Sequence, residues 1–304
     1  MKPVHIRTIS EFHKLHLLEP PDHPLISVVD YAKVAEAKKV LPVQPIVSDY
    51  YTVSVKRGLG GKMRYGQQEY DFDEGIMYFM APGQVLQPAP PNNTSEKPSG
   101  WILLIHPDFL WNTPLAKNIR RYGFFDYAIH EALFLSDKEE AIINSIVHNI
   151  QQEARANIDH FTQNIIVSQL ETLFNYAERF YQRQFITRKV SSHKILDRLE
   201  DYLSNYFNEK HINEKGLPTV QSIADALNTS PNYLSALLKS LTGQTTQQHI
   251  HNKLIEKAKE KLSTTDLSVS EIAYELGFEH PQSFNKFFKA KTSQSPLAFR
   301  QSFN

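Results

Sequence analysis

Cysteine is absent from the 304 residues of this chain, which excludes disulfide bonds and thiolate metal sites and fits a reducing compartment. No run of about 18 consecutive apolar residues occurs, so no segment has the composition of a membrane-spanning helix. The N-terminal stretch MKPVHIRTISEFHKLHLLEPPDHP also lacks the apolar core of a signal peptide. The sequence therefore predicts a cytoplasmic location and no membrane partner.

An excess of charge is also absent, because 33 Lys and Arg residues balance 33 Asp and Glu residues. The whole chain thus gives no electrostatic reason to bind nucleic acid or membranes, and any such reason must be local. Apolar residues make up 41% and charged residues 22%, which excludes disordered, collagen-like and low-complexity classes. A chain of this length is long enough for two domains, each with its own core.

The first 135 residues have the pattern of a β domain. Short β-prone runs are separated by clusters of Pro, Gly, Asn and Asp, such as GLGG and PAPPNNTSEKPSG. Several short strands at this spacing favour a barrel or a sandwich. The runs are LISVVDY, YYTVSVKR, GIMYFMAP and GWILLIHP.

Residues 136–186 have a helical pattern instead. Ser136 and Glu139 have the spacing of a capping box, and apolar residues then recur every three to four positions. Either these helices pack on the β domain as an outer layer, or part of their apolar stripe forms a dimer interface. We expect a dimerisation segment here. The periodic residues are Ile142, Ile143, Ile146, Val147 and Ile150, then Phe161, Ile165, Leu170, Leu173, Phe174, Ala177 and Phe180.

Residues 186–194 are polar and short of apolar anchors, so they are predicted to be the linker to a second domain, residues 192–304. Leu196, Leu199, Leu203 and Phe207 then mark the first of several helices. The second domain is therefore expected to be all α.

Two helix-turn-helix units are predicted beyond residue 217. In the first, a helix carrying Ala224 ends at Asn228, and Ser230 with Pro231 starts the next helix, which closes at Gly243. A small residue where two helices cross, followed by a tight turn, is the helix-turn-helix plan.

The second unit repeats this design. Ser270 is expected to cap a helix, Gly277 supplies a residue with positive φ at the turn, and Phe278 fills the corner. On the following helix Phe284, Phe287 and Phe288 recur at helical spacing and are expected to be buried.

The opposite face of that last helix is polar. Amides pair with the N6/N7 edge of adenine, Lys donates to guanine O6/N7, and Ser contacts bases or phosphate, so this face is expected to enter the major groove of DNA. The first unit offers fewer such groups and is expected to contact phosphate more. The predicted DNA-binding residues are Gln282, Ser283, Asn285, Lys286 and Lys289, with Asn232, Tyr233, Ser235, Ala236 and Lys239 in the first unit.

A linker helix is predicted over residues 246–263, with Ile250, Leu254, Ala258 and Leu262 on one side. Such a helix is about 27 Å long. With recognition helices beyond both ends, their separation approaches the roughly 34 Å between successive turns of one groove. The segment from Glu279 to Arg300 carries four basic residues and one acidic residue, which fits DNA binding or a solvated helix face.

These residues resemble a known family. KLIEKAKEKLSTTDLSVSEIAYELGFEHPQSFNKFFKAKTSQSP is similar to the C-terminal motif of AraC/XylS-type transcription regulators, and VQSIADALNTSPNYLSALLKSLTGQTTQQHI resembles the preceding half of their DNA-binding domain. The resemblance implies double-stranded promoter or operator DNA as the partner, and RNA polymerase as a further one. It also adds Pro281 to the groove-facing positions. One departure is Ser293, where the family commonly has Gly.

In this family the N-terminal domain is often a cupin-like barrel that senses a small molecule, and YGQQEYDFDEGIMYFMAPGQVLQP is similar to the central hairpins of such barrels. The resemblance implies an effector site in the barrel interior. The residues predicted to line it are Tyr51, Met63, Tyr65, Tyr78 and Trp101, although each of them also fits a structural role as barrel filling.

A metal-dependent cupin enzyme with an appended helical domain is the alternative function. Such a site needs several imidazoles and a carboxylate, yet no His occurs between Tyr50 and Trp101. We therefore expect no catalytic residue, no metal and no cofactor. The sequence predicts an α+β protein: a cupin-like β-barrel with a helical dimerisation segment, then two helix-turn-helix units. Its expected function is that of an effector-modulated, homodimeric transcription regulator, with an RNA-binding module as a further alternative.

Overall fold

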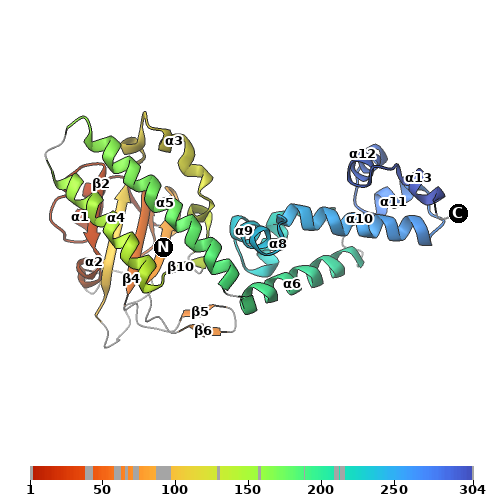
Figure 1. The fold of residues 1–304 in the computed structure, drawn as a ribbon, viewed down its shortest axis with the longest axis horizontal. Helices are drawn as coiled ribbons and strands as arrows, with labels where there is room; N and C mark the ends of the chain where they lie inside the picture. Colours follow the sequence, from red (N-terminus) through yellow and green to blue (C-terminus); the bar gives the residue numbers. More distant parts are fainter. Residues whose placement is uncertain are drawn as a thin grey trace. The chain divides into compact units, whose positions relative to one another are not determined.

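The computed structural model (Figure 1) describes residues 3–37, 44–57, 63–65, 68–70, 75–86, 97–128, 131–156, 159–187, 189–208, 212 and 216–302. The chain divides into two compact units, Met1–Gln184 and Phe185–Asn304. The first is a mixed α+β unit rich in strands and the second is helical.

A five-stranded sheet forms the centre of the first unit, in the order β10-β7-β4-β9-β2. All four pairings in it are antiparallel. The four β-prone runs of the sequence supply β2, β4, β7 and β9, four of its five strands, as predicted. Its strands are β2 (Ile26–Asp30), β4 (Tyr51–Arg57), β7 (Ile76–Met80), β9 (Ser99–Ile105) and β10 (Leu133–Phe134).

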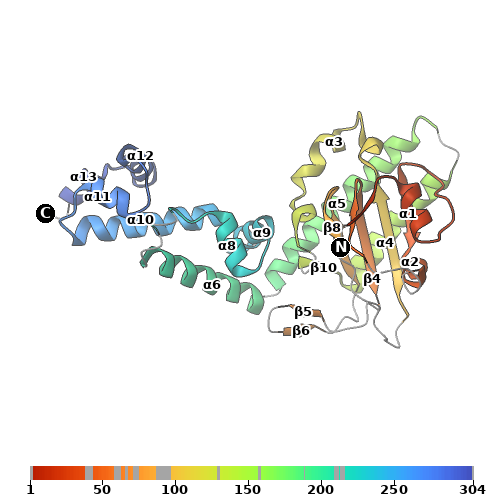
Figure 2. The ribbon, with the colours of Figure 1, turned by 180° about the vertical axis from the view of Figure 1, so that it is seen from behind.

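The two faces of this sheet are both buried. Successive side chains of a strand point to opposite faces, and the register sets Val53 opposite Leu103 and Phe79 on one face. Figures 1 and 2, seen from opposite sides, place α4 (Asp137–Arg155) and α5 (Thr162–Thr187) over one side of the sheet. We call that side the helix face.

The other side, which we call the cluster face, packs on the N-terminal segment. Its buried residues come from β2, β9, β1 (Val4–Ile6), α1 (Ile9–Leu15) and α2 (Tyr31–Ala37). They are Ile6, Ile9, Val29, Tyr31, Val34, Tyr50, Ile102 and Leu104.

Two smaller sheets accompany the central one. One has the order β1-β3-β8, with β3 (Ile46–Ser48) parallel to β1 and antiparallel to β8 (Val85–Leu86). The other pairs β5 (Met63–Tyr65) with β6 (Gln68–Tyr70). Over the described ranges these sheets are not joined into a closed barrel, so the cupin-like barrel stays a prediction.

The connection between β9 and β10 is mostly helical. Its described residues include 3-10 turns at Pro107–Leu110, Ile119–Arg121 and Gly123–Asp126 and the short helix α3 (Pro114–Asn118). Phe124 and Phe125 from the last turn are buried, and both rings contact Phe79 of β7 and Phe174 of α5. This aromatic cluster fastens α5 to the helix face.

Helix α4 begins where the capping box predicts, because the Glu139 carboxylate accepts from both the backbone N–H and the hydroxyl of Ser136. The apolar stripe of α4 and α5 is buried within this one chain. Ile143, Ile150, Leu170, Leu173, Phe174 and Ala177 are all fully buried, whereas Ile142, Phe161 and Ile165 are exposed. The outer-layer interpretation therefore accounts for most of the stripe, and the dimer prediction is left with few apolar residues.

The predicted linker is helical on both sides of residue 188, because α5 continues to Thr187 and α6 (Lys189–Asn208) follows. Propensity explains this, since its polar residues include good helix formers. In the described part of the chain no helix is both long and apolar enough to cross a membrane. The second unit continues with α8 (Val220–Leu227), α9 (Pro231–Thr242), α10 (Thr246–Thr264), α11 (Val269–Glu275), α12 (Pro281–Thr292) and α13 (Pro296–Gln301).

Candidate nucleic-acid interface

The second unit contains two helix pairs of one design, α8 with α9 and α11 with α12. At the crossing of each pair lies a fully buried alanine, Ala224 in the first and Ala273 in the second. Small residues there let the two helix backbones approach closely, because a larger side chain would hold them apart. The predicted helix-turn-helix pairs are thus both formed.

The turns inside the pairs are also as predicted. Asn228 ends α8 in the left-handed conformation, with φ 56°, and Gly277 follows α11 with φ 81°. Ser230 accepts from the backbone N–H of Tyr233 as the N-cap of α9, and Pro231 is the first residue of that helix. An Asn tolerates the left-handed region where most residues do not.

One predicted cap is wrong. Ser268, not Ser270, is the N-cap of α11: its hydroxyl accepts from the N–H of Glu271, whose carboxylate accepts from the N–H of Ser268. Ser268 has Glu three residues later whereas Ser270 has Ala, so the reciprocal capping box decides where the helix starts.

The second helices of the two pairs end alike. Thr242 donates its hydroxyl to the carbonyl of Leu238, and Thr292 donates to the carbonyl of Phe288, each over 2.8 Å. The same hydroxyls accept from the backbone N–H two residues later. The repeat in the sequence therefore extends to individual hydrogen bonds at the helix ends.

Helix α12 separates its side chains by face, as predicted. Phe284 and Phe288 are fully buried. Phe287 is only half-buried and lies between the rings of His251 and Phe278, at 5.1 and 5.7 Å. The five polar residues predicted to meet DNA are all exposed, and their side chains have no hydrogen-bond or ion-pair partner among the described residues: Gln282, Ser283, Asn285, Lys286 and Lys289. Pro281 is half-buried at the first helical position.

Helix α9 corrects part of the predicted set. Tyr233 is 6% exposed, and its ring packs edge-on against Phe185 at 5.2 Å, so it belongs to the core of the second unit and not to a DNA-facing surface. Ser235 is half-buried and its hydroxyl is hydrogen-bonded to that of Thr246 over 3.0 Å. Ala236 is half-buried, while Asn232 and Lys239 are exposed. The burial of Tyr233 depends on a residue far away in sequence, which helical spacing does not reveal.

Helix α10 joins the two pairs. It packs on α6 and α9 at one end and on α11 and α13 at the other. Ile250, Leu254, Ala258 and Leu262 are all buried, as their spacing predicts. Its 19 residues correspond to about 28 Å. Lys261 of α10 also pairs with Glu275 of α11 over 2.7 Å, which ties the second pair to the linker helix.

The predicted effector residues of the first unit do not share one surface. Trp101 is paired with Val55, and both lie on the helix face. Tyr51 lies two residues before Val53 on β4 and therefore points to that same face. Tyr78 pairs with Ser54, which pairs with Ile102 on the cluster face. One interior therefore cannot be lined by all of them. The side chains of Met63 and Tyr65 lie outside the described part of the structure.

Two of the predicted effector residues are half-buried tyrosines with raised pKa values. Burial raises the pKa of Tyr78 well above its usual range and also raises that of Tyr51. The Lys56 ammonium lies 5.3 Å from the ring centroids of both Tyr31 and Tyr78. Among the described residues no group of three His, Asp or Glu side chains is arranged to hold a metal ion.

Comparison with known proteins gives the class of the second unit. Residues 223–302 match the family model described as a helix-turn-helix domain. That range spans most of the first helix pair, α10 and the whole second pair, so the fold and the match agree.

The curated relatives that match the chain are named as transcriptional regulators or activators. The chain is 30% identical over 144 residues to the HTH-type transcriptional regulator YfiF of Bacillus subtilis, covering 47% of this chain and 42% of that protein. It is 32% identical over 106 residues to the HTH-type transcriptional activator RhaS of Enterobacter sp., covering 35% and 36%. It is 29% identical over 113 residues to the bifunctional transcriptional activator/DNA repair enzyme AdaA of Bacillus subtilis, covering 37% and 50%. The chain thus spans half or less of the length of these relatives.

Among solved structures, the C-terminal domain of AraT, a response regulator from Geobacillus stearothermophilus, is 30% identical, with a TM-score of 0.32 over 36% of this chain and 84% of that one. The DNA-binding domain of AdpA, solved in complex with a target DNA, is 26% identical, with a TM-score of 0.30 over 34% and 91%. The C-terminal part of the chain, over residues 223–302, therefore carries a helix-turn-helix domain.

Proposed function

We propose that this protein is a sequence-specific, DNA-binding transcription regulator. The observation that carries the proposal is the exposed polar face of α12, which has no side-chain partner in the described part of the chain and lies opposite the buried Phe284 and Phe288. Amide, hydroxyl and ammonium groups on one helix face match the donors and acceptors of the major groove. The family match over residues 223–302 and the matched transcription regulators support the same function.

Within α12 the side chains have different roles in this proposal. Gln282 and Asn285 are one turn apart on the exposed face and read bases, since an amide can donate to and accept from one base edge. Lys286 and Lys289 neutralise phosphates or donate to guanine. In the first pair, the exposed Asn232 and Lys239 contact DNA. Ser235 and Ala236 are half-buried, and the hydrogen bond from Ser235 to Thr246 helps to hold α9 against α10.

A small-molecule effector bound in the first unit is the second part of the proposal. An effector acts by favouring one arrangement of the DNA-binding units over another. An antiparallel sheet with apolar side chains buried on both of its faces supports a cupin-like domain. We further propose a homodimer that uses the exposed Ile142, Phe161 and Ile165, and contact with RNA polymerase at the promoter.

Regulation is favoured here over metal-dependent catalysis because the matched relatives are transcription regulators. One matched relative, AdaA, is named as a DNA repair enzyme as well as a transcriptional activator, so catalysis is kept as the alternative. If catalysis were the main role, elemental analysis of the purified protein would find stoichiometric iron or zinc.

Selection of bound sequences from a random DNA duplex pool tests the function directly. The expected result is one enriched motif, with two elements about one helical turn apart. Asn285→Ala should then weaken binding to that motif about tenfold or more, as loss of a good amide-base pair does. Lys194→Ala, an exposed residue on α6, is the control and should bind as the wild type does. An unenriched pool, or equal binding by Asn285→Ala, would contradict the proposal or its site respectively.

A further inference from the structure

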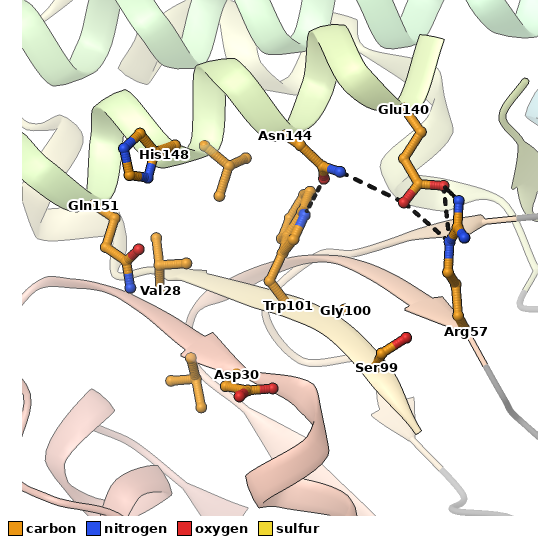
Figure 3. Close-up of a pocket in the computed structure, with 12 residues that line it drawn as sticks. Val28, Asp30, Arg57, Ser99, Gly100, Trp101, Glu140, Asn144, His148 and Gln151 are labelled. Atoms are coloured by element: carbon orange, nitrogen blue, oxygen red, sulfur yellow. Dashed lines mark hydrogen bonds and ion pairs between the residues drawn. The ribbon is translucent and has the colours of Figure 1, made fainter. Parts of the chain in front are cut away.

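A pocket of about 680 Å³ lies in the first unit between α4 and strands β2 and β9, of which β2 is at the edge of the sheet. Figure 3 shows Asn144, His148 and Gln151 reaching toward it from α4, and Asp30 and Trp101 from the sheet. The volume suits a small molecule. This pocket lies on the helix face, and of the predicted effector residues whose side chains are described, namely Tyr51, Tyr78 and Trp101, only Trp101 lines it.

Most polar groups at one end of the pocket are already paired. The Arg57 guanidinium donates to both oxygens of Glu140, at 2.6 to 3.1 Å. Asn144 accepts from the indole N–H of Trp101 over 2.7 Å and donates to Glu140 over 3.5 Å (Figure 3). Arg57, the one Arg or Lys residue of the lining, is thus paired with Glu140, one of the two carboxylates of the lining.

The second carboxylate, Asp30, has no such partner. It is directly opposite Trp101 across the β2–β9 pairing, where side chains of opposed residues lie close together. Asp30 Oδ1 accepts from the backbone N–H of Ala32 over 2.8 Å, and the described residues offer it no ion pair. Asp30 is exposed, and it leaves the pocket with a negative charge that no described residue pairs.

The other lining residues do not neutralise that charge. His148 Nε2 lies 2.7 Å from the Gln152 amide nitrogen. That amide nitrogen can only donate, so this ring nitrogen is already used by Gln152 and does not serve Asp30. Val28 and Val147 add apolar surface, and Gln151 adds an amide.

We propose that this pocket binds a small organic cation, an alkylammonium compound. Its ammonium group pairs with Asp30 and lies against the π-surface of Trp101, whose N–H is already used. Its alkyl part contacts Val28 and Val147. An anion would be repelled by Asp30. This site goes beyond the DNA-binding function and stands without it, because ligand binding is measured with no DNA present.

Tryptophan fluorescence provides the test. The chain has two tryptophans, and Trp111 is 72% exposed, so Trp111→Phe leaves Trp101 as the reporter. Choline and putrescine, as cationic probes, should change the Trp101 emission saturably. Glucose, as a neutral polyol, and acetate, as an anion, should not. Raising the salt concentration should weaken cation binding, because screening reduces the attraction to Asp30.

The Asp30→Asn variant isolates the charge. An Asn side-chain oxygen still accepts from the Ala32 N–H, so the local fold is kept while the charge is lost. Cation binding should weaken about fivefold or more, as expected for loss of an ion pair beside an aromatic ring. Asp108→Asn, at an exposed site outside the pocket, should bind like its parent. Equal binding by Asp30→Asn, saturation by glucose as tight as by the cations, or no saturation by either cation would overturn the proposal.

Discussion

Gly243 and Ser293 end the two recognition helices in the same left-handed conformation, with φ of 74° and 62°. The N–H of each donates to the carbonyl of a lysine four residues earlier, Lys239 or Lys289. A glycine adopts this conformation without steric cost, whereas a serine is strained in it. The two helix-turn-helix units therefore close with one geometry but with different residues.

Exchange of these residues should change stability in opposite directions. Ser293→Gly is expected to stabilise the second unit by about 0.5–1 kcal/mol, because it relieves the strain at positive φ. Gly243→Ser should destabilise it by about 1 kcal/mol, and space is not the reason, since an added Cβ at Gly243 would meet nothing within 4 Å. Urea denaturation followed by circular dichroism measures both. Equal midpoints for Ser293→Gly and the wild type would show that the turn relaxes around serine.

Lys286→Ala should weaken DNA binding without changing which sequence is preferred. Loss of one phosphate contact is expected to reduce the slope of log affinity against log salt by about 1. Gln282→Ala should instead leave that slope unchanged and relax the preference at one base pair. Titrations by fluorescence anisotropy at several salt concentrations distinguish the two. If both variants changed only the slope, the face of α12 would contact backbone and not bases.

Tyr233→Ala should act through folding and not through loss of a DNA contact. Removal of a buried aromatic ring from its packing against Phe185 is expected to cost about 3–5 kcal/mol. A lower melting temperature in thermal denaturation, compared with Lys239→Ala on the exposed side of α9, checks this. A variant with unchanged melting temperature but lost DNA binding would restore Tyr233 to the predicted interface.

Gly75→Ala and Glu140→Gln should both destabilise the first unit through loss of the ion pair between Arg57 and Glu140. A Cβ at Gly75 would collide with the Glu140 carboxylate, and that collision would displace it from Arg57. Since the Arg57 side chain is 40% exposed, loss of this pair is expected to cost about 1–2 kcal/mol. The double variant should cost little more than either single one, because both remove one interaction. Additive losses in denaturation would separate the two effects.

Stability should fall on acidification through two histidines of the second unit. Burial lowers the pKa of His251, with a further contribution from Lys291, and burial also lowers the pKa of His249. The unfolded chain then binds protons before the folded one does, so the free energy of unfolding falls as pH drops below about 6.5. His251→Gln should flatten this dependence between pH 7.5 and 5, and His160→Gln, at an exposed site, should not. An unchanged pH profile in His251→Gln would contradict this.

Much of the second unit follows from local sequence. The burial of Phe284 and Phe288, the turns at Asn228 and Gly277, and the buried side of α10 depend on helical spacing and on left-handed residues. Helical spacing and left-handed residues each depend on residues within a few positions along the chain, so a sequence pattern predicts these features. The exposure of Gln282 and Asn285 follows as the other side of the same helix.

Other features depended on partners distant in sequence. Tyr233 is buried because Phe185 lies against it. The apolar stripe of α4 and α5 is buried because these helices pack on one face of the sheet. Strand register put Trp101 and Tyr78 on opposite faces, and pairing of β2 with β9 put Asp30 beside Trp101. The sequence by itself determined the helices, their turns and the polar face of α12, because these are set by neighbours along the chain. Only the tertiary structure decided which tyrosines are covered and where a pocket opens, because both depend on the register and packing of segments far apart in the chain.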